Sequence, residues 1–188
     1  MERAVPISMR YIAALVLCGL ALPVFADKAA VEGLRVYLDE GRYRVDADVH
    51  LTLPPAVREA LHNGIALVFE VRAELRRENI MIPDSLVTQH RRRYRLEYRP
   101  LLERYVVTEL GGARTVETHL RLRDALKAIG RIRGWPLIEK RQLDRSHTYY
   151  VRVRGELLLT ELPLPLQLHA YVKPSWWIAT PWAEVPLR

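Results

Sequence analysis

Residues 43–53 read YRVDADVHLTL, and this stretch decides the fold class. Apolar side chains occupy every second position of it, at Tyr43, Val45, Ala47, Val49, Leu51 and Leu53. Because successive side chains of a strand point to opposite faces, the pattern predicts a strand with one buried and one solvent-facing side. The same alternation recurs at residues 34–38, 65–75, 94–98, 149–159 and 166–172, so strands dominate the chain.

Two short segments follow a different period. Residues 54–64 begin with Pro-Pro, carry one apolar helical stripe and end with Asn-Gly. Residues 122–129, LRDALKAI, place apolar side chains at i, i+3, i+4 and i+7, the spacing of an amphipathic helix. Gly111-Gly112 separates two further runs and indicates a hairpin. The sequence therefore predicts a mainly β, sandwich-like antiparallel fold of about eight strands with two short amphipathic helices.

The composition is that of a globular protein. Of 188 residues, 49% are hydrophobic, 27% are charged and 9 are glycine, which excludes a disordered, collagen-like or multi-span membrane chain. The formal net charge is +7, from 29 basic and 22 acidic residues. Arginine supplies almost all of the positive charge, which fits a codon bias as well as it fits anion binding. We expect one β-rich domain over residues 27–188, closed by a Trp- and Pro-rich segment at 174–188.

The first 26 residues have the order of a secretory signal peptide. Arg3 and Arg10 precede an uncharged apolar run at residues 12–22, and Val24-Phe25-Ala26 offers a cleavage site between Ala26 and Asp27. We therefore expect export to the periplasm. An uncleaved N-terminal anchor in the inner membrane is the alternative. The single cysteine, Cys18, lies inside the apolar run, so the processed chain would contain no disulfide and no thiolate.

Residues with catalytic or metal-binding chemistry are sparse. Asp46, Asp48 and His50 share one face of a strand, about 6.8 Å apart, so a metal would need ligands from another strand. No serine stands in G-x-S-x-G, and Ser146-His147 would point to opposite faces of an extended chain. We expect no enzyme activity and no cofactor, and we regard the Asp-Asp-His row as a solvent-facing strand face.

The densest basic segment contains Arg91, Arg92, Arg93 and Arg95. One interpretation is a binding site for an anionic partner, such as a lipid headgroup or an acidic protein face. The other is the ordinary charged face of an antiparallel sheet, paired with acidic side chains. Export removes nucleic acid as a partner.

Three of the four tryptophans, Trp176, Trp177 and Trp182, lie within seven residues of the C-terminal segment. They could anchor a partner or a membrane interface. They could also fold back to cap the core, which we favour for Trp176 and Trp182 because large aromatic rings bury the most surface. In an extended chain Trp177 points away from Trp176, so we expect Trp177 to be the exposed one.

Several spaced features together resemble a known family. They are Ala60-Leu61 with Gly64-Ile65, Tyr94-x-Leu-x-Tyr98 with Leu101-Leu102 and Tyr105, Leu122 with Ala125-Leu126, Val151-Arg152-Val153-Arg154, Leu162-Pro163-Leu164-Pro165-Leu166, and Ser175-Trp176 with Trp182. The chain resembles exported proteins of Gram-negative bacteria that share a domain of unknown function, sometimes called proline-rich signal peptide proteins. The resemblance implies an envelope protein without assigned catalytic residues. Genes of such proteins often lie beside that of a membrane sensor kinase, which implies a role in envelope sensing.

From these observations we expect a non-enzymatic periplasmic binding module, accessory to a membrane sensor or another envelope protein, with an anionic lipid surface as a further partner. The alternative is a carrier of a small apolar or lipid-like ligand. Its cavity would lie between sheet and helix, with residues 122–129 as the lid.

Overall fold

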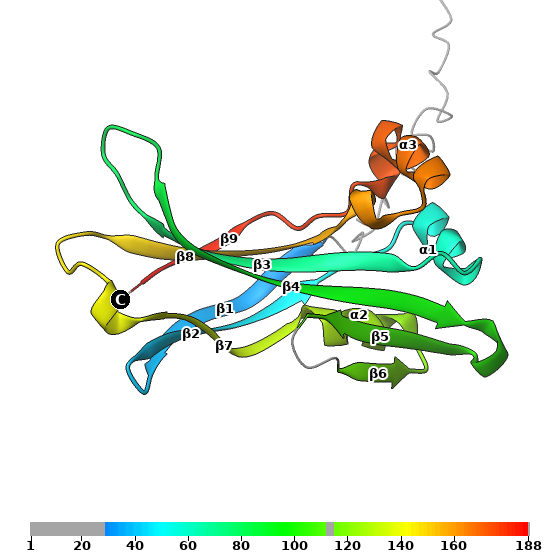
Figure 1. Ribbon diagram of the computed structural model, residues 1–188, viewed down its shortest axis with the longest axis horizontal. Coiled ribbons are helices and arrows are strands. Elements are labelled where there is room, and N and C mark those ends of the chain that lie inside the picture. Colours follow the sequence, from blue (N-terminus) through cyan, green and yellow to red (C-terminus); the bar gives the residue numbers. More distant parts are fainter. Residues whose placement is uncertain (1–28, 112–114, 188) are drawn as a thin grey trace, which may run out of the picture.

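Two antiparallel β-sheets pack face to face in the protein (Figure 1). The computed structural model describes residues 29–111 and 115–187. The strand order is β1-β2-β7 in the small sheet and β6-β5-β4-β3-β8-β9 in the large one. The nine strands of the described part are β1 (Ala30–Asp39), β2 (Arg42–His50), β3 (Leu67–Arg77), β4 (Ser85–Arg99), β5 (Arg104–Leu110), β6 (Val116–His119), β7 (Arg131–Glu139), β8 (Tyr149–Leu157) and β9 (Ala183–Pro186). The expected sandwich-like β fold is confirmed. The expected leader at residues 1–26, with its Ala26–Asp27 cleavage site, lies outside the described residues.

Two of the three helices in this part are those expected from the sequence. Helix α1 (Pro55–His62) starts at Pro55 and buries Val57, Ala60 and Leu61. Helix α2 (Leu122–Gly130) buries Ala125, Leu126 and Ile129, and it packs against β2, β5 and β6. The apolar stripes of both helices are thus the faces that meet the core.

The third helix corrects an expectation. Residues 166–172 were expected to form a strand, but Leu164–Val172 form helix α3. The strand period and the helix period are hard to distinguish in LPLQLHAYV because nearly every residue of this segment is apolar. Pro163 and Pro165 decide between them, since proline lacks the N–H that a strand ladder needs and fits the first turn of a helix. Of this helix only Ala170 is buried.

The core lies between the two sheets and follows the period-two pattern. On the central strand β3, Phe69, Val71, Ala73 and Leu75 are fully buried. On β2, Val45, Ala47 and Val49 face them from the small sheet. The strand expected over 43–53 ends at His50, and Leu51 and Leu53 continue into the core as part of the connection to α1.

A two-residue turn joins β1 to β2. Glu40 and Gly41 both have positive φ values, 46° and 76°, as a type I′ hairpin turn requires. β7 pairs antiparallel with β2, and Gly134 (φ +57°) lies beside a shift in this register. The pairing brings residues about 90 positions apart in sequence into one sheet.

Two glycines allow α2 and β8 to approach β2 closely. A Cβ on Gly130 would lie 1.9 Å from the backbone oxygen of Val49, and a Cβ on Gly155 would lie 2.6 Å from the Val49 Cγ1 methyl. The first contact is with the main chain and the second with a side chain, so only the second can be relieved by a smaller side chain at position 49.

We expect Gly130→Ala to lower the free energy of unfolding by about 3 kcal/mol because the strand or the helix must move. Urea denaturation in a double-mutant cycle with Val49→Ala measures the difference. Val49→Ala should recover part of the loss caused by Gly155→Ala and none of the loss caused by Gly130→Ala. Equal recovery in both cycles would contradict the close approach of α2 to β2.

Candidate functional site

The arginine segment does not form one continuous basic surface. Arg91 and Arg93 point to the outer face of the large sheet, where both lie near Glu70. Arg92 points inward, 3.9 Å from Glu109, with its guanidinium 4.8 Å from the ring centre of Trp135. Arg95 is exposed and makes no ion pair within the described residues. The alternation along β4 therefore divides the four arginines between two faces.

Glu70 on β3 is the centre of the outer face. Its side chain is only 1% exposed because arginines cover it. Arg72 donates to Glu70 Oε1 from Nη2 at 2.8 Å, and Arg93 Nε donates to Glu70 Oε2 at 2.9 Å. Arg72 also reaches Glu156 Oε1 on β8 at 2.8 Å. Glu70 and Arg72 together thus link β4, β3 and β8.

Glu74, four residues along the same strand, repeats the arrangement. It accepts from Arg152 of β8, from Arg76 and from Gln89 of β4, all within 3.2 Å. Arg152 and Arg154 in turn lie over the ring of Trp182, with guanidinium carbons 4.2 and 5.5 Å from its centre. We call the ion pairs around Glu70 and Glu74 the outer ion-pair network.

The carboxylates of this network neutralise most of the positive charge on the outer face of the large sheet. Burial opposes ionisation of Glu70, but hydrogen bonds from Arg72 and Arg93 outweigh it and hold its pKa below the usual value. The pKa of Glu74 is lowered in the same way, against burial, by Arg152 and Arg76. Because the arginines are engaged within the sheet, the network is better suited to holding strands together than to binding an anion.

The three C-terminal tryptophans take different positions. Trp176 is 3% exposed and belongs to the core, whereas Trp177 is 62% exposed, as expected. Trp182 is half-buried under the arginines of the outer ion-pair network. The three rings therefore do not form one aromatic patch.

Trp177 instead borders an apolar surface on α3. Its Nε1 donates to the Ala170 carbonyl oxygen at 3.2 Å. The exposed face of the helix continues this surface, and we call the set the α3 surface: Leu164, Leu168, Tyr171, Val172 and Trp177, each between 48% and 77% exposed. The α3 surface could not be recognised from the sequence, because residues 166–172 were expected to alternate along a strand.

Each member of the Asp-Asp-His row of β2 contacts a charged side chain, and Asp46 also accepts from a backbone amide. Asp46 accepts from Arg35 Nη2 at 2.9 Å and from the Gly134 amide at 2.8 Å. Arg133 Nη2 lies 2.8 Å from both oxygens of Asp48. His50 faces Glu32 at 3.4 Å. Asp46 is buried by these neighbours, so the row is not uniformly solvent-facing. The described residues contain no group of three or more His, Cys, Asp or Glu side chains placed to hold a metal ion.

Ser146 and His147 meet in a turn, contrary to the expectation that they point apart. Ser146 Oγ lies 3.0 Å from His147 Nδ1 and donates to Asp144 Oδ1 at 2.8 Å. The Ser146 amide also donates to Asp144, and these bonds lower the pKa of that carboxyl. In a catalytic triad, one ring nitrogen of the histidine faces the serine hydroxyl and the other ring nitrogen faces the carboxylate. Here Asp144 lies 3.3 Å from His147 Nδ1, the same ring nitrogen that faces the Ser146 hydroxyl, so the three side chains close a turn and do not form a relay.

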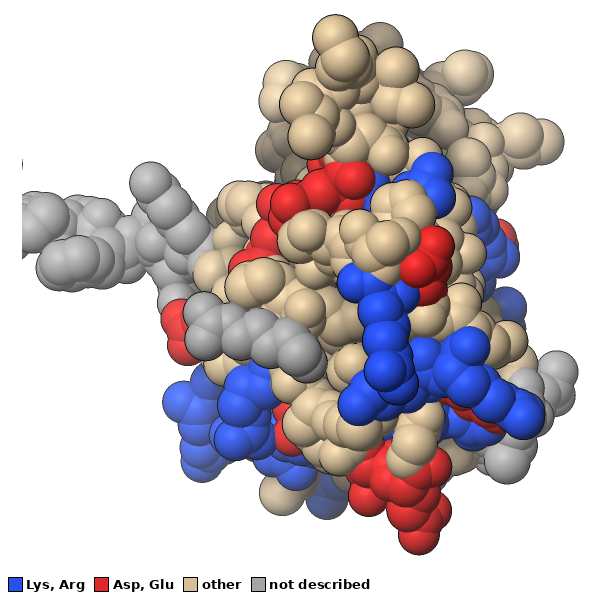
Figure 2. All heavy atoms as spheres, turned by 90° about the vertical axis from the view of Figure 1, so that its left-hand side faces the viewer, with Lys and Arg blue, Asp and Glu red and all other residues tan. Residues whose placement is uncertain are grey.

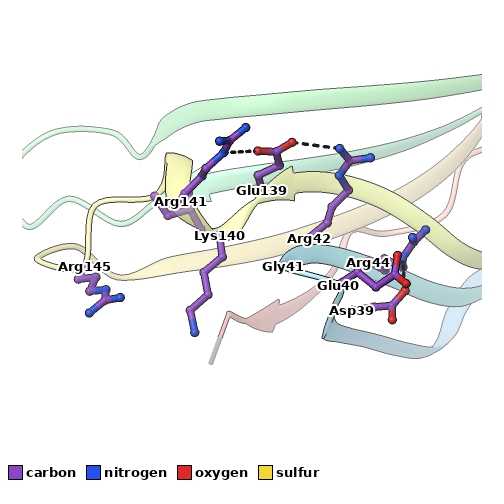
Figure 3. Close-up of a pocket in the computed structure, with 10 residues that line it drawn as sticks. Asp39, Glu40, Gly41, Arg42, Arg44, Glu139, Lys140, Arg141 and Arg145 are labelled. Atoms are coloured by element: carbon purple, nitrogen blue, oxygen red, sulfur yellow. Dashed lines mark hydrogen bonds and ion pairs between the residues drawn. The ribbon is translucent and has the colours of Figure 1, made fainter.

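A basic pocket of about 690 Å³ lies where the β1–β2 turn meets the β7–β8 connection (Figure 3). Glu139 bridges Arg42 and Arg141, and Asp39 lies 2.7 Å from Arg44 Nε. Figure 3 shows Lys140 and Arg145 extending away from this chain of ion pairs, and neither has an acidic partner within the described residues. Sequence reasoning missed this pocket because Arg42 and Lys140 come together only through β2–β7 pairing.

A second cavity, a groove of about 750 Å³, lies between α1 and α2. Its apolar floor contains Leu51, Leu53, Leu122 and Leu126. Arg58, Arg123 and Lys127 line it with one carboxylate, Asp124. Another side carries Tyr105, whose hydroxyl lies 2.8 Å from His62 Nε2. We call this the α1–α2 groove.

A domain of unknown function, DUF4390, matches residues 26–186 of the chain. The chain belongs to this family. The match confirms the resemblance that the sequence suggested and leaves the activity open, since the family description assigns none. No curated protein and no solved structure matches the chain. Among the described residues of this DUF4390 protein, none of the helices has the length and hydrophobicity of a membrane-crossing segment.

We expect Glu70→Gln to lower the free energy of unfolding by about 2 kcal/mol at pH 7, because Arg72 and Arg93 lose their charged acceptor. A carboxyl whose pKa is lowered by folding stabilises the protein above its usual pKa of 4.5 and loses this effect as the pH falls toward the folded-state value. The difference between the variant and the wild type should therefore shrink below about pH 4.5 in urea titrations.

Glu97→Gln is the matched control, since Glu97 lies on β4 and pairs with Arg99 at 2.8 Å in a more exposed setting. Its cost should stay below about 0.5 kcal/mol. A cost for Glu70→Gln no larger than that of the control, or one that is independent of pH, would contradict a stabilising role of the outer ion-pair network.

Proposed function

We propose that the protein is a non-enzymatic binding module of the bacterial cell envelope that binds a partner protein through the α3 surface. The observation that carries this proposal is the exposure of four large apolar side chains on one short, braced helix, with Trp177 exposed beside them. Apolar patches of this kind commonly mark sites of interaction. The order of the N-terminal residues supports export, which would place the module in the periplasm.

The spacing on α3 supports a protein as the partner. Leu164, Leu168, Tyr171 and Val172 stand at i, i+4, i+7 and i+8, so they share one helix face. Helices that dock into a groove of another protein present anchors at this spacing. Trp177 adds an aromatic side chain of the type that dominates binding energy in protein interfaces.

The helix is also held in a fixed position before any partner binds. Gln167 Nε2 donates to the carbonyl oxygens of Thr160 and Leu162, at 2.9 and 2.7 Å. Trp176 and Ile178, which follow the helix, are anchored in the core. A rigid apolar helix loses little conformational entropy on docking, which favours recognition. The family resemblance makes a membrane sensor protein the partner that we favour.

We expect a photo-crosslinking residue at position 168, in living cells, to form an adduct with one envelope protein. Trp177→Ala in the same chain should reduce this adduct at least fivefold, as loss of an interface anchor does. The matched control is position 120, because Leu120 is 66% exposed but lies outside the α3 surface. Immunoblots of crosslinked envelope fractions provide the measurement. The absence of an adduct at 168, or equal adducts at 168 and 120, would refute this interface.

Arg93→Glu is unsuitable as a test of partner binding. Arg93 contacts the buried Glu70, so this substitution would place two carboxylates together and destabilise the large sheet. Variants of the exposed α3 surface avoid this difficulty, because their side chains contribute little to the core.

A carrier of an anionic amphiphile is the second candidate function, and the α1–α2 groove favours it. The groove combines an apolar floor with three cationic side chains and has α2 as one wall. Its volume lies within the range of small-molecule sites. Lys127 has no acidic partner within 4 Å among the described residues, so it is available for a carboxylate or phosphate headgroup.

We expect the protein to bind dodecanoate and Arg123→Glu/Lys127→Glu to weaken this binding about tenfold, because the charge at the groove is reversed. Displacement of a fluorescent fatty acid measures the affinity, and native mass spectrometry gives the stoichiometry. Lys140→Glu, a charge reversal in the basic pocket, should leave the affinity unchanged. If the protein does not bind dodecanoate, or if both variants behave alike, the groove is not a carrier site.

A further inference from the structure

The basic pocket between the β1–β2 turn and the β7–β8 connection holds more positive than negative charge. Five cationic side chains and three carboxylates line it, an excess of two positive charges. Figure 2 looks onto this end of the molecule and shows blue side chains gathered mainly over its lower half, with red ones among them. The pocket is concave and its volume, about 690 Å³, is that of a small-molecule site. A cleft of this kind concentrates the field of the charges that line it.

Three of the five cations face carboxylates inside the pocket. Glu139 accepts from Arg42 through Oε1 at 3.1 Å and from Arg141 through Oε2 at 2.5 Å. The bonds from Arg141 and Arg42 hold the pKa of the Glu139 carboxyl below its usual value. Asp39 Oδ2 lies 2.7 Å from Arg44 Nε. Each oxygen of Glu139 is thus engaged by an arginine, so these two carboxylates leave the remaining cations uncompensated.

The remaining cations are Lys140 and Arg145, and neither contacts an acidic side chain within the described residues. Figure 3 shows both extending away from the ion pairs of Glu139. Glu40, the third carboxylate, stands with Asp39 at the β1–β2 turn, on the opposite side of this view from Arg145. Two cations that line one pocket without a counter-ion form an arrangement that an external anion completes.

The two free cations stand on short turns whose main chain is held in place. The Lys140 amide donates to the Gly41 carbonyl oxygen at 2.9 Å, which fixes this residue against the β1–β2 turn. Beside Arg145, the Ser146 amide donates to Asp144 Oδ1 at 2.9 Å. A ligand therefore has to order only the two side chains, and this lowers the entropy cost of binding.

We propose that the basic pocket binds the phosphoryl group of a phosphomonoester, with Lys140 and Arg145 as its principal contacts. A phosphomonoester carries close to two negative charges at neutral pH and has three terminal oxygens, which matches the excess charge of the pocket. The guanidinium of Arg145 can donate two parallel hydrogen bonds to a phosphate, and the ammonium of Lys140 acts as a point charge. A carboxylate brings a single charge and would leave one of these cations uncompensated.

The lining distinguishes this ligand from the amphiphile proposed for the α1–α2 groove. Among the described residues of the basic pocket, Leu143 has the only large apolar side chain, whereas the groove has a floor of leucines. The pocket therefore suits a polar phosphate group and offers no surface for a hydrocarbon chain. A small soluble ester and the headgroup of a phospholipid share this phosphate chemistry, and the experiment below separates them.

The test is isothermal titration calorimetry of the full-length chain with glycerol 3-phosphate at low salt. Lys140→Gln/Arg145→Gln should weaken binding at least tenfold, because both principal contacts lose their charge. The matched control is Arg95→Gln/Arg121→Gln, which removes the same charge from two exposed arginines outside the pocket and should change the affinity less than twofold. Glu40→Gln should strengthen binding about threefold, because a charge of the same sign as the ligand leaves the pocket. A folding defect would not produce this gain.

Flotation with phosphatidylcholine vesicles that contain phosphatidic acid distinguishes the source of the phosphate. Binding of glycerol 3-phosphate in solution identifies a soluble ester, whereas binding to the vesicles alone, lost in Lys140→Gln/Arg145→Gln, identifies a lipid headgroup. Wild-type protein that binds neither probe overturns the proposal. Equal losses in the pocket and control variants also overturn it, as does vesicle binding that the pocket variant retains when the soluble ester does not bind. Neither measurement involves the α3 surface or dodecanoate, so the result is independent of the proposed function.

Discussion

The large sheet depends on two carboxylates, Glu70 and Glu74, on the outward face of its central strand. The antiparallel register places Arg72 of β3 directly between Arg91 of β4 and Arg154 of β8. Three like charges in one row would repel each other and separate the strands. Glu70 and Glu74 stand in the rows on either side, and their hydrogen bonds to arginines from three strands turn this repulsion into attraction.

The same network determines which surfaces remain available for binding. Arginines that are held by Glu70, Glu74 and Glu156 cannot bind an external anion without breaking those bonds. Trp182 is likewise covered by Arg152 and Arg154. The surfaces that we identify as available for binding therefore lie outside the middle of the sheet, at the α3 surface, in the basic pocket and in the α1–α2 groove. This distribution is the reason for proposing apolar docking rather than charge recognition on the sheet face.

The ends of the sandwich combine apolar and basic features in different ways. The basic pocket gathers charged side chains around the β1–β2 turn, whereas the α1–α2 groove places an apolar floor inside a cationic boundary. A concave apolar floor suits a bound hydrocarbon chain. The α3 surface, a flat helix face, suits a groove on a partner.

Much of the fold could be predicted from local pattern. At residues 43–49 and 67–75, the alternation of apolar residues indicates which face of each strand meets the core. Within 122–129, the helical spacing of apolar residues indicates which face of the helix does so. The exposure of Trp177 and the burial of Trp176 followed from the same reasoning. The prediction from apolar pattern was wrong at α3. A segment that is apolar at almost every position fits the period of a strand and that of a helix, and only its prolines distinguish the two.

The sequence by itself determined the sandwich-like β class, the two amphipathic helices and the scarcity of reactive groups. Only the tertiary structure decided which charges are neutralised and where the cavities lie. The physical reason is that a side chain's charge and polarity are local properties, whereas its partner is set by strand register and sheet order. Arg93 contacts Glu70, and Arg42 contacts Glu139, only because separate segments of the chain pair in a sheet. The spacing of residues within one segment does not specify these contacts.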